Sequence, residues 1–141
     1  MNFNNFTIKS QEIIQQAQLL AQENNNQEIT NEHLFQSILN IDENVTPFIL
    51  KKLAVNINLV NQLVENQLKS LSKVTGGDLQ LSRITATTLN EASIIAKKMN
   101  DEYVSIEHLI LAIYNSKSKI AQILKDQGIN KKDLERYEIN K

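Results

Sequence analysis

Two histidines are the residues of this sequence whose types and spacing first suggest chemistry. They occur in TNEHL at 30–34 and SIEHL at 105–109, so each follows a glutamate and the two lie 75 positions apart. A metal site needs several His, Cys or carboxylate ligands that converge on one point. The chain has no other histidine and no cysteine. We therefore expect no metal, and interpret the pair as a helix start that occurs twice, with each histidine packed at a seam between repeats.

The adjacent glutamates and histidines also raise the question of acid–base catalysis. A general acid and a general base must converge on one reacting group, but neighbouring side chains on a helix diverge by about 100°. The sequence contains no recognisable hydrolase nucleophile motif, and none of its three glycines lies in a GxxxxGK[ST] phosphate-binding loop. We expect no catalytic residues, no cofactor and no enzymatic activity.

Glu32 and Glu107 follow a hydroxyl-bearing residue, Thr30 or Ser105, by two positions. One interpretation is that each carboxylate stabilises the N-terminus of its own helix, by roughly 0.3–1 kcal/mol. The other is that each marks a ligand site, because a carboxylate suits a guanidinium group and a helix N-terminus suits a phosphate. Both interpretations stay open on the residues alone.

Composition indicates that helices position these residues. Three glycines and one proline among 141 residues are too few for the turns of an all-β domain or the loops of a doubly wound α/β domain. A net charge of −1 without a basic run argues against nucleic acid as a partner. The sequence lacks an apolar run of the ~18 residues that span a membrane and a secretory signal. We expect a cytoplasmic protein with no membrane partner.

Apolar residues recur at helical spacing along most of the chain. Thr7, Thr30 and Ser105 stand where N-caps belong, and Gly128 stands where a helix ends. Asn56 or Asn58 can cap the helix that follows Pro47 and its short helix. We expect about seven or eight helices, over residues 8–23, 31–41, 47–53, 59–71, 84–99, 106–113, 120–127 and 133–137, and no sheet.

The second half of the chain repeats the first. ITNEHLFQSILN (29–40) aligns with VSIEHLILAIYN (104–115) at a shift of 75, and ILKKLAVN (49–56) aligns with ILKDQGIN (123–130) at a shift of 74. Two copies are too few for a solenoid. We expect one compact all-α domain over 1–141 with pseudo-twofold symmetry, in which repeat 1 covers about 3–74, a joint 75–82, and repeat 2 about 83–138.

These motifs together resemble the N-terminal double-repeat (Clp-N) domain of the Clp ATPases. The matching segments are FTIKSQEIIQQAQLLAQ (6–22), VTGGDLQLS (74–82) and MNDEYVSIEHLILAIY (99–114), and the resemblance covers about residues 3–138. Within that family the GGD joint is most similar to the ClpB disaggregase branch.

The resemblance implies a non-catalytic, substrate-binding chaperone domain that captures exposed hydrophobic segments of unfolded or aggregated proteins in the stress response. The parent chain would carry AAA+ modules that form a hexamer and would work with an Hsp70-type co-chaperone system. The chain would then be an isolated domain, cut just before the linker to the ATPase rings, and a monomer on its own.

The resemblance also implies site residues, which we carry over by position. The substrate-binding residues expected from it are Thr7, Asp101, Glu107, Ile95 and Glu32. Ile95 would form the wall of an apolar groove, but Glu91 and His108 stand where better-known members are often apolar. The charged residues between 91 and 102 either rim such a groove or form an ordinary solvated face.

Two alternative functions remain open. One is an adaptor-docking or phosphoarginine-binding N-domain of a ClpA- or ClpC-type unfoldase, in which the motif glutamates would bind phosphorylated arginine. The other is a stand-alone Clp-N protein without ATPase modules. The GGD joint favours the ClpB type, and the full-length gene would decide among them.

Overall fold

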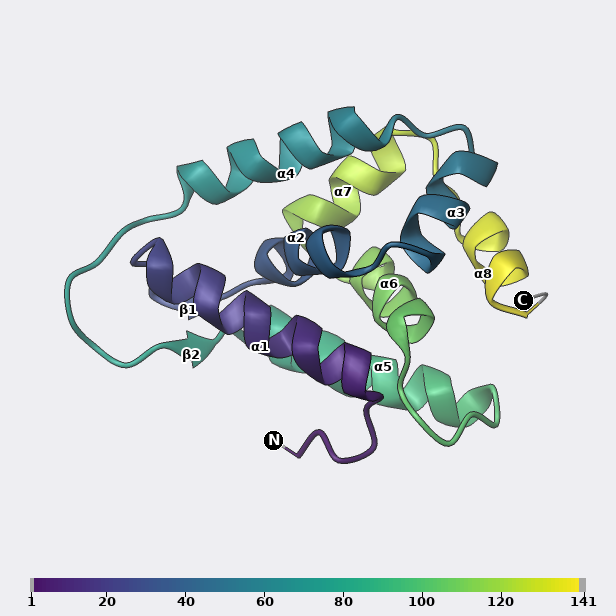
Figure 1. The fold of residues 1–141 in the computed structure, drawn as a ribbon, viewed down its shortest axis with the longest axis horizontal. Helices are drawn as coiled ribbons and strands as arrows, with labels where there is room; N and C mark the ends of the chain where they lie inside the picture. The colour runs from purple at the N-terminus through teal and green to yellow at the C-terminus, as the bar shows by residue number, and fades with distance from the viewer. Residues whose placement is uncertain (1, 140–141) are drawn as a thin grey trace.

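The computed structural model describes residues 2–139, and in that part of the chain eight helices and one small parallel sheet form the regular structure (Figure 1). The prediction of an all-α domain with seven or eight helices is confirmed. The first four helices are α1 (Ile8–Glu23), α2 (Asn31–Ile41), α3 (Val45–Lys52) and α4 (Ile57–Ser70). The second four are α5 (Arg83–Lys98), α6 (Ile106–Asn115), α7 (Lys119–Asp126) and α8 (Lys131–Ile139).

The prediction that there is no sheet is wrong, because β1 (Glu28–Ile29) and β2 (Gln80–Leu81) form a parallel pair. The N–H of Ser82 donates to the carbonyl of Ile29 at 3.0 Å. The same bond recurs 75 positions away, where the N–H of Thr7 donates to the carbonyl of Val104 at 3.0 Å. Two-residue strands are too short to show an alternating pattern in a sequence. Each repeat therefore pairs the segment before its second helix with the segment before the other repeat's first helix.

The predicted caps begin and end the helices. Thr7 Oγ1 accepts the Ser10 N–H at 3.1 Å and caps α1, and Thr30 caps α2. Of the two candidates for α4, Asn56 is the N-cap. Gly128 follows α7 with φ +88°, a left-handed conformation that glycine adopts without strain. Local sequence signals thus set the positions of the elements.

Helices α2 and α6, which carry the repeated EHL motif, form the centre of the domain. Each is buried along most of its length, and each packs against the first helix of its own repeat, α1 or α5, and against the other. Helix α4 lies across α2 and α7, and α8 packs on α6. No helix in the described part of the chain is long and apolar enough to cross a membrane. The starts of α2 and α6 consequently lie where the two repeats meet.

Candidate functional site

Three of the predicted site residues, Thr7, Asp101 and Glu107, gather around the start of α6. The hydrogen bond between the Thr7 N–H and the Val104 carbonyl joins the start of α1 to this region. Asp101 follows α5 and its side chain is 41% exposed. Glu107 is buried in the first turn of α6. We refer to Thr7, Asp101 and Glu107 as the α6 cluster.

His108 connects the two carboxylates of the α6 cluster. Its Nδ1 accepts the backbone N–H of Ser105 at 2.9 Å, and its Nε2 lies 2.8 Å from Asp101 Oδ2. Because Nδ1 is an acceptor, the fitting tautomer carries its hydrogen on Nε2 and donates it to Asp101. Ser105 Oγ donates in turn to the Glu107 carboxylate. A continuous set of hydrogen bonds, through a buried histidine, therefore fixes Asp101 relative to Glu107.

The order Ser–His–Asp in this network is that of a hydrolase triad, but the serine hydroxyl gives its hydrogen to Glu107. The other repeat builds the same network from Thr30, His33 and Asn26, with His33 Nε2 2.9 Å from Asn26 Oδ1. The network therefore forms equally well with an asparagine or an aspartate as the partner of the histidine. Both networks are capping boxes, in which the third helical residue accepts the N–H of the N-cap, and we assign no nucleophile.

The histidines act separately in the structure. Each bonds to a partner in its own repeat, and burial lowers the pKa of His33 to about 4. Among the described residues no three His, Cys, Asp or Glu side chains come close enough to hold a metal ion.

Apolar surface lies beside the α6 cluster. Ile95, the predicted groove wall, is half-buried on α5 and packs against the core. Ile8 and Tyr103 are exposed, and they belong to the two segments that the Thr7–Val104 bond joins. The region therefore combines fixed polar groups with apolar side chains that have little cover.

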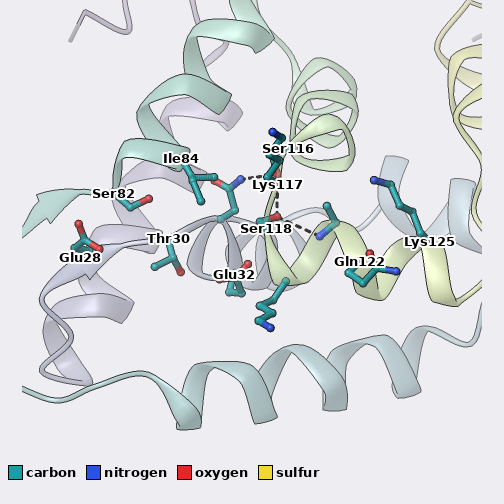
Figure 2. Close-up of a pocket in the computed structure, with 13 residues that line it drawn as sticks. Glu28, Thr30, Glu32, Ser82, Ile84, Ser116, Lys117, Ser118, Gln122 and Lys125 are labelled. Carbon is teal, nitrogen blue, oxygen red and sulfur yellow. Dashed lines mark hydrogen bonds between the residues drawn. The ribbon is translucent and has the colours of Figure 1, made fainter.

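Glu32 lies apart from the α6 cluster, in a pocket of about 700 Å³ between the starts of α2, α5 and α7 (Figure 2). Its Oε2 accepts the N–H of Ile120, in the first turn of α7, at 3.1 Å. Burial raises the pKa of Glu32, and the Ile120 hydrogen bond and the Lys119 charge oppose that rise. The carboxylate of Glu32, a residue of α2, thus stabilises the N-terminus of α7 in the other repeat.

The start of α3 has a carboxylate cap from its own repeat. At the start of α3, the counterpart of α7, Asp42 accepts the N–H groups of residues 44, 45 and 46 at 3.0, 3.1 and 2.6 Å. Burial by itself would raise the pKa of Asp42, but these bonds and that from the Thr46 hydroxyl lower it below its usual value. A carboxylate of the same repeat therefore caps α3, whereas Glu32 reaches α7 from the other repeat.

Sequence reasoning missed several residues of the Glu32 pocket. Asn31 and the lysines Lys117, Lys119 and Lys125 line it. The alternating run SKSK at 116–119 was the visible signal, but only the fold brings that turn against the starts of α2 and α5.

Comparisons with known proteins agree with this fold. The profile of the Clp repeat (R) N-terminal domain family matches residues 5–127. The chaperone protein ClpB of Bacteroides thetaiotaomicron is 46% identical over 134 residues, which cover 95% of this chain and 16% of the relative. The Hsp104 N-terminal domain from Candida albicans superposes with a TM-score of 0.85 at 19% identity, over 97% of this chain and 91% of that one. A ClpV N-domain in complex with a VipB peptide gives 0.78 at 19% identity, over 98% and 87%.

Proposed function

The chain belongs to the Clp repeat N-terminal domain family, and on that premise we propose that it is the substrate-binding N-terminal domain of a ClpB-type, ATP-dependent protein disaggregase. The chain spans 16% of the length of the ClpB chaperone that it matches. ATP hydrolysis, the AAA+ hexamer and cooperation with an Hsp70-type system would belong to the remainder of such a parent protein. The role of this domain would be to capture unfolded or aggregated polypeptides, without bond chemistry of its own.

The observation that carries this proposal is the α6 cluster with its apolar neighbours. Asp101 presents an exposed carboxylate that His108 holds in place at 2.8 Å. A fixed acceptor can bind a backbone N–H of an extended segment without first losing side-chain freedom. Ile8 and Tyr103 offer exposed apolar surface nearby, to which apolar side chains of an unfolded polypeptide can bind.

Weak and permissive binding follows from this arrangement. The apolar contacts are few and the polar contacts can be made by the backbone of any sequence. Such a site would release its cargo readily to the AAA+ hexamer of the parent protein. The complex of a ClpV N-domain with a VipB peptide supports the proposal, since that domain has the same fold.

Fluorescence anisotropy of labelled, permanently unfolded casein tests the proposal. We expect a saturable rise in anisotropy when this domain is added, and none when the labelled protein is a stably folded one. A lack of any rise with casein would contradict the proposal and favour the adaptor-docking alternative, in which a folded protein binds the domain and cargo does not.

A further inference from the structure

The Glu32 pocket contains a buried acceptor without a hydrogen-bond partner. Asn31 is 1% exposed, and its Nδ2 donates to Thr88 Oγ1 and Ser116 Oγ, both at 2.9 Å. Those hydroxyls give their own hydrogens to the carbonyls of Ile84 and Ile113, so both must accept from Asn31 and the orientation of its amide is fixed. Asn31 Oδ1 then has no partner among the described residues.

An unpaired buried acceptor destabilises the folded protein, because it has lost its hydrogen bonds to water and gained none in return. Asn31 lines the same pocket as Glu32, whose carboxylate accepts the backbone N–H of Ile120 and also bonds to Thr30 and to its own backbone. The base of the pocket therefore presents two acceptors, one of which lacks a donor. A ligand with N–H groups would supply what the protein does not.

Basic side chains surround the mouth of this pocket. Lys117, Lys119 and Lys125 are exposed there, and Figure 2 shows Lys117 in the turn between α6 and α7 and Lys125 further along α7. Glu28 is the exposed acid on the lining. A chain with a net charge of −1 thus gathers positive charge at this mouth.

An apolar hollow continues the pocket along α5. This second hollow, of about 410 Å³, shares Ile84, Ser116 and Lys117 with the first. It is also lined by Thr87 and Ala112 and by one charge of each sign, Arg83 and Glu91. Ile84, at the junction of the two, is 43% exposed. We refer to the two hollows together as the Ile84 groove. The groove has an apolar part, a basic mouth and one unpaired acceptor at its base.

We propose that the Ile84 groove binds an extended segment of unfolded polypeptide in which an acidic side chain stands beside an apolar one. The apolar side chain packs against Ile84, the acidic one pairs with Lys117 and Lys119, and backbone N–H groups of the segment face the acceptors at the base. The inference rests on the proposed function and names the class of cargo segment that this second site selects.

The corresponding region of repeat 1, at the start of α3, does not share the preference for acidic segments. When the two repeats are aligned at a shift of 75 positions, Asp42 corresponds to Lys117 and Asn44 to Lys119. The hollow beside α3, of about 480 Å³, is lined by Glu43, Asn44 and Glu107 together with Lys51. Acidic segments gain little from such a lining, because like charges repel one another. Binding of acidic segments is therefore confined to one of the two pseudo-symmetric halves.

Three fluorescein-labelled peptides of one apolar sequence test this inference, with Asp, Asn or Lys at the positions flanking the apolar residue. We expect the Asp peptide to bind this domain roughly fivefold more tightly than the Lys peptide, since two exposed ion pairs of modest strength distinguish them. The Lys117→Glu/Lys119→Glu variant should abolish that ranking. The Lys131→Glu/Lys132→Glu variant, with the same charge change, should retain it because α8 lies at the far end of the domain from the start of α5 in Figure 1.

Three results would overturn the inference. The Asp, Asn and Lys peptides could bind equally, the two double variants could lose the ranking equally, or free phosphoarginine could shift the NMR signals of Glu32 and Lys117 while the Asp peptide shifts neither. If casein binds and the peptide ranking is absent, the inference fails and the proposed function stands. If neither casein nor any peptide binds, both fail.

Discussion

His108 and Asp101 are hydrogen-bonded at 2.8 Å at the position where the other repeat joins His33 to Asn26 at 2.9 Å. The two networks have the same capping box and the same spacing along the chain. The difference is that repeat 2 places an exposed carboxylate where repeat 1 places a buried amide. The two repeats therefore share their helix starts but differ at this position, where repeat 2 has a charged, solvent-accessible group.

Replacing Asp101 by asparagine reproduces the residue of the other repeat. We expect the Asp101→Asn variant to keep its melting temperature within a few degrees, because the asparagine oxygen still accepts from His108 Nε2. Its affinity for unfolded casein should fall severalfold, by about 1 kcal/mol, since a charged acceptor becomes a neutral one. Thermal unfolding and casein anisotropy measure the two effects. A variant that unfolds readily would show instead that Asp101 is a structural residue.

His33 gives the domain a pH-dependent stability. Burial lowers its pKa from the ordinary 6.5 to about 4 in the folded state, so the unfolded chain binds the proton more readily. The stability from this residue is present above about pH 6.5 and is lost as the pH falls toward 4, by roughly 3 kcal/mol in all. Urea unfolding at pH 7, 6 and 5 measures it.

The His33→Gln variant is the matched control for that pH series. Glutamine at this position of a capping box can still accept the N–H of Thr30 but does not titrate. The slope of stability against pH should be shallower in the variant than in the original domain. An equal slope would assign the pH dependence to other groups.

Glu32 contributes through its hydrogen bond rather than its charge. Burial raises the pKa of this carboxyl, so the charged form costs stability as the pH rises through the folded-state pKa. We expect Glu32→Gln to be at least as stable as the original at pH 7, because the amide oxygen can accept the Ile120 N–H. Glu32→Ala should lose about 1–3 kcal/mol. Equal losses in the two variants, measured by urea unfolding, would contradict this account.

Ala54 and Gly128 end equivalent helices, α3 and α7, with φ of +57° and +88°. A left-handed conformation strains an alanine by about 1–2 kcal/mol and leaves a glycine unstrained. Ala54→Gly should therefore raise the free energy of unfolding by up to about 1 kcal/mol, and Gly128→Ala should lower it by about 1 kcal/mol. Changes of the same sign in the two variants would contradict the equivalence.

The elements of this fold were predictable where their signals are local. Thr30 and Ser105 begin helices, and the backbone N–H of each donates to the histidine three residues later. Gly128 ends a helix through its own conformation. The repeat was predictable because the shift of 75 keeps whole segments in register. The two short strands were missed, since two residues carry no periodic pattern.

The sites were less predictable than the elements, because their contacts join distant positions. Glu32 was selected from its motif, but its bond to Ile120 spans 88 positions and no local pattern indicates it. His108 was expected to be a packing residue, and its link from Asp101 to Ser105 appears only when the end of α5 meets the start of α6. The binding roles of all five predicted site residues stay predictions: Thr7, Asp101, Glu107, Ile95 and Glu32.

The most direct test of the central proposal is a residue-resolved NMR titration of this domain with unfolded casein. We predict saturable shifts at Thr7, at Ile95 and across residues 101–108, and none on the outer face of α4 around Leu59. Asp101→Asn should reduce them, and Asn26→Asp, the reciprocal change in the other repeat, should not. An absence of shifts at Thr7 and 101–108 while casein binds, or no shifts at all, would contradict the assignment of the α6 cluster as the site that captures unfolded polypeptides.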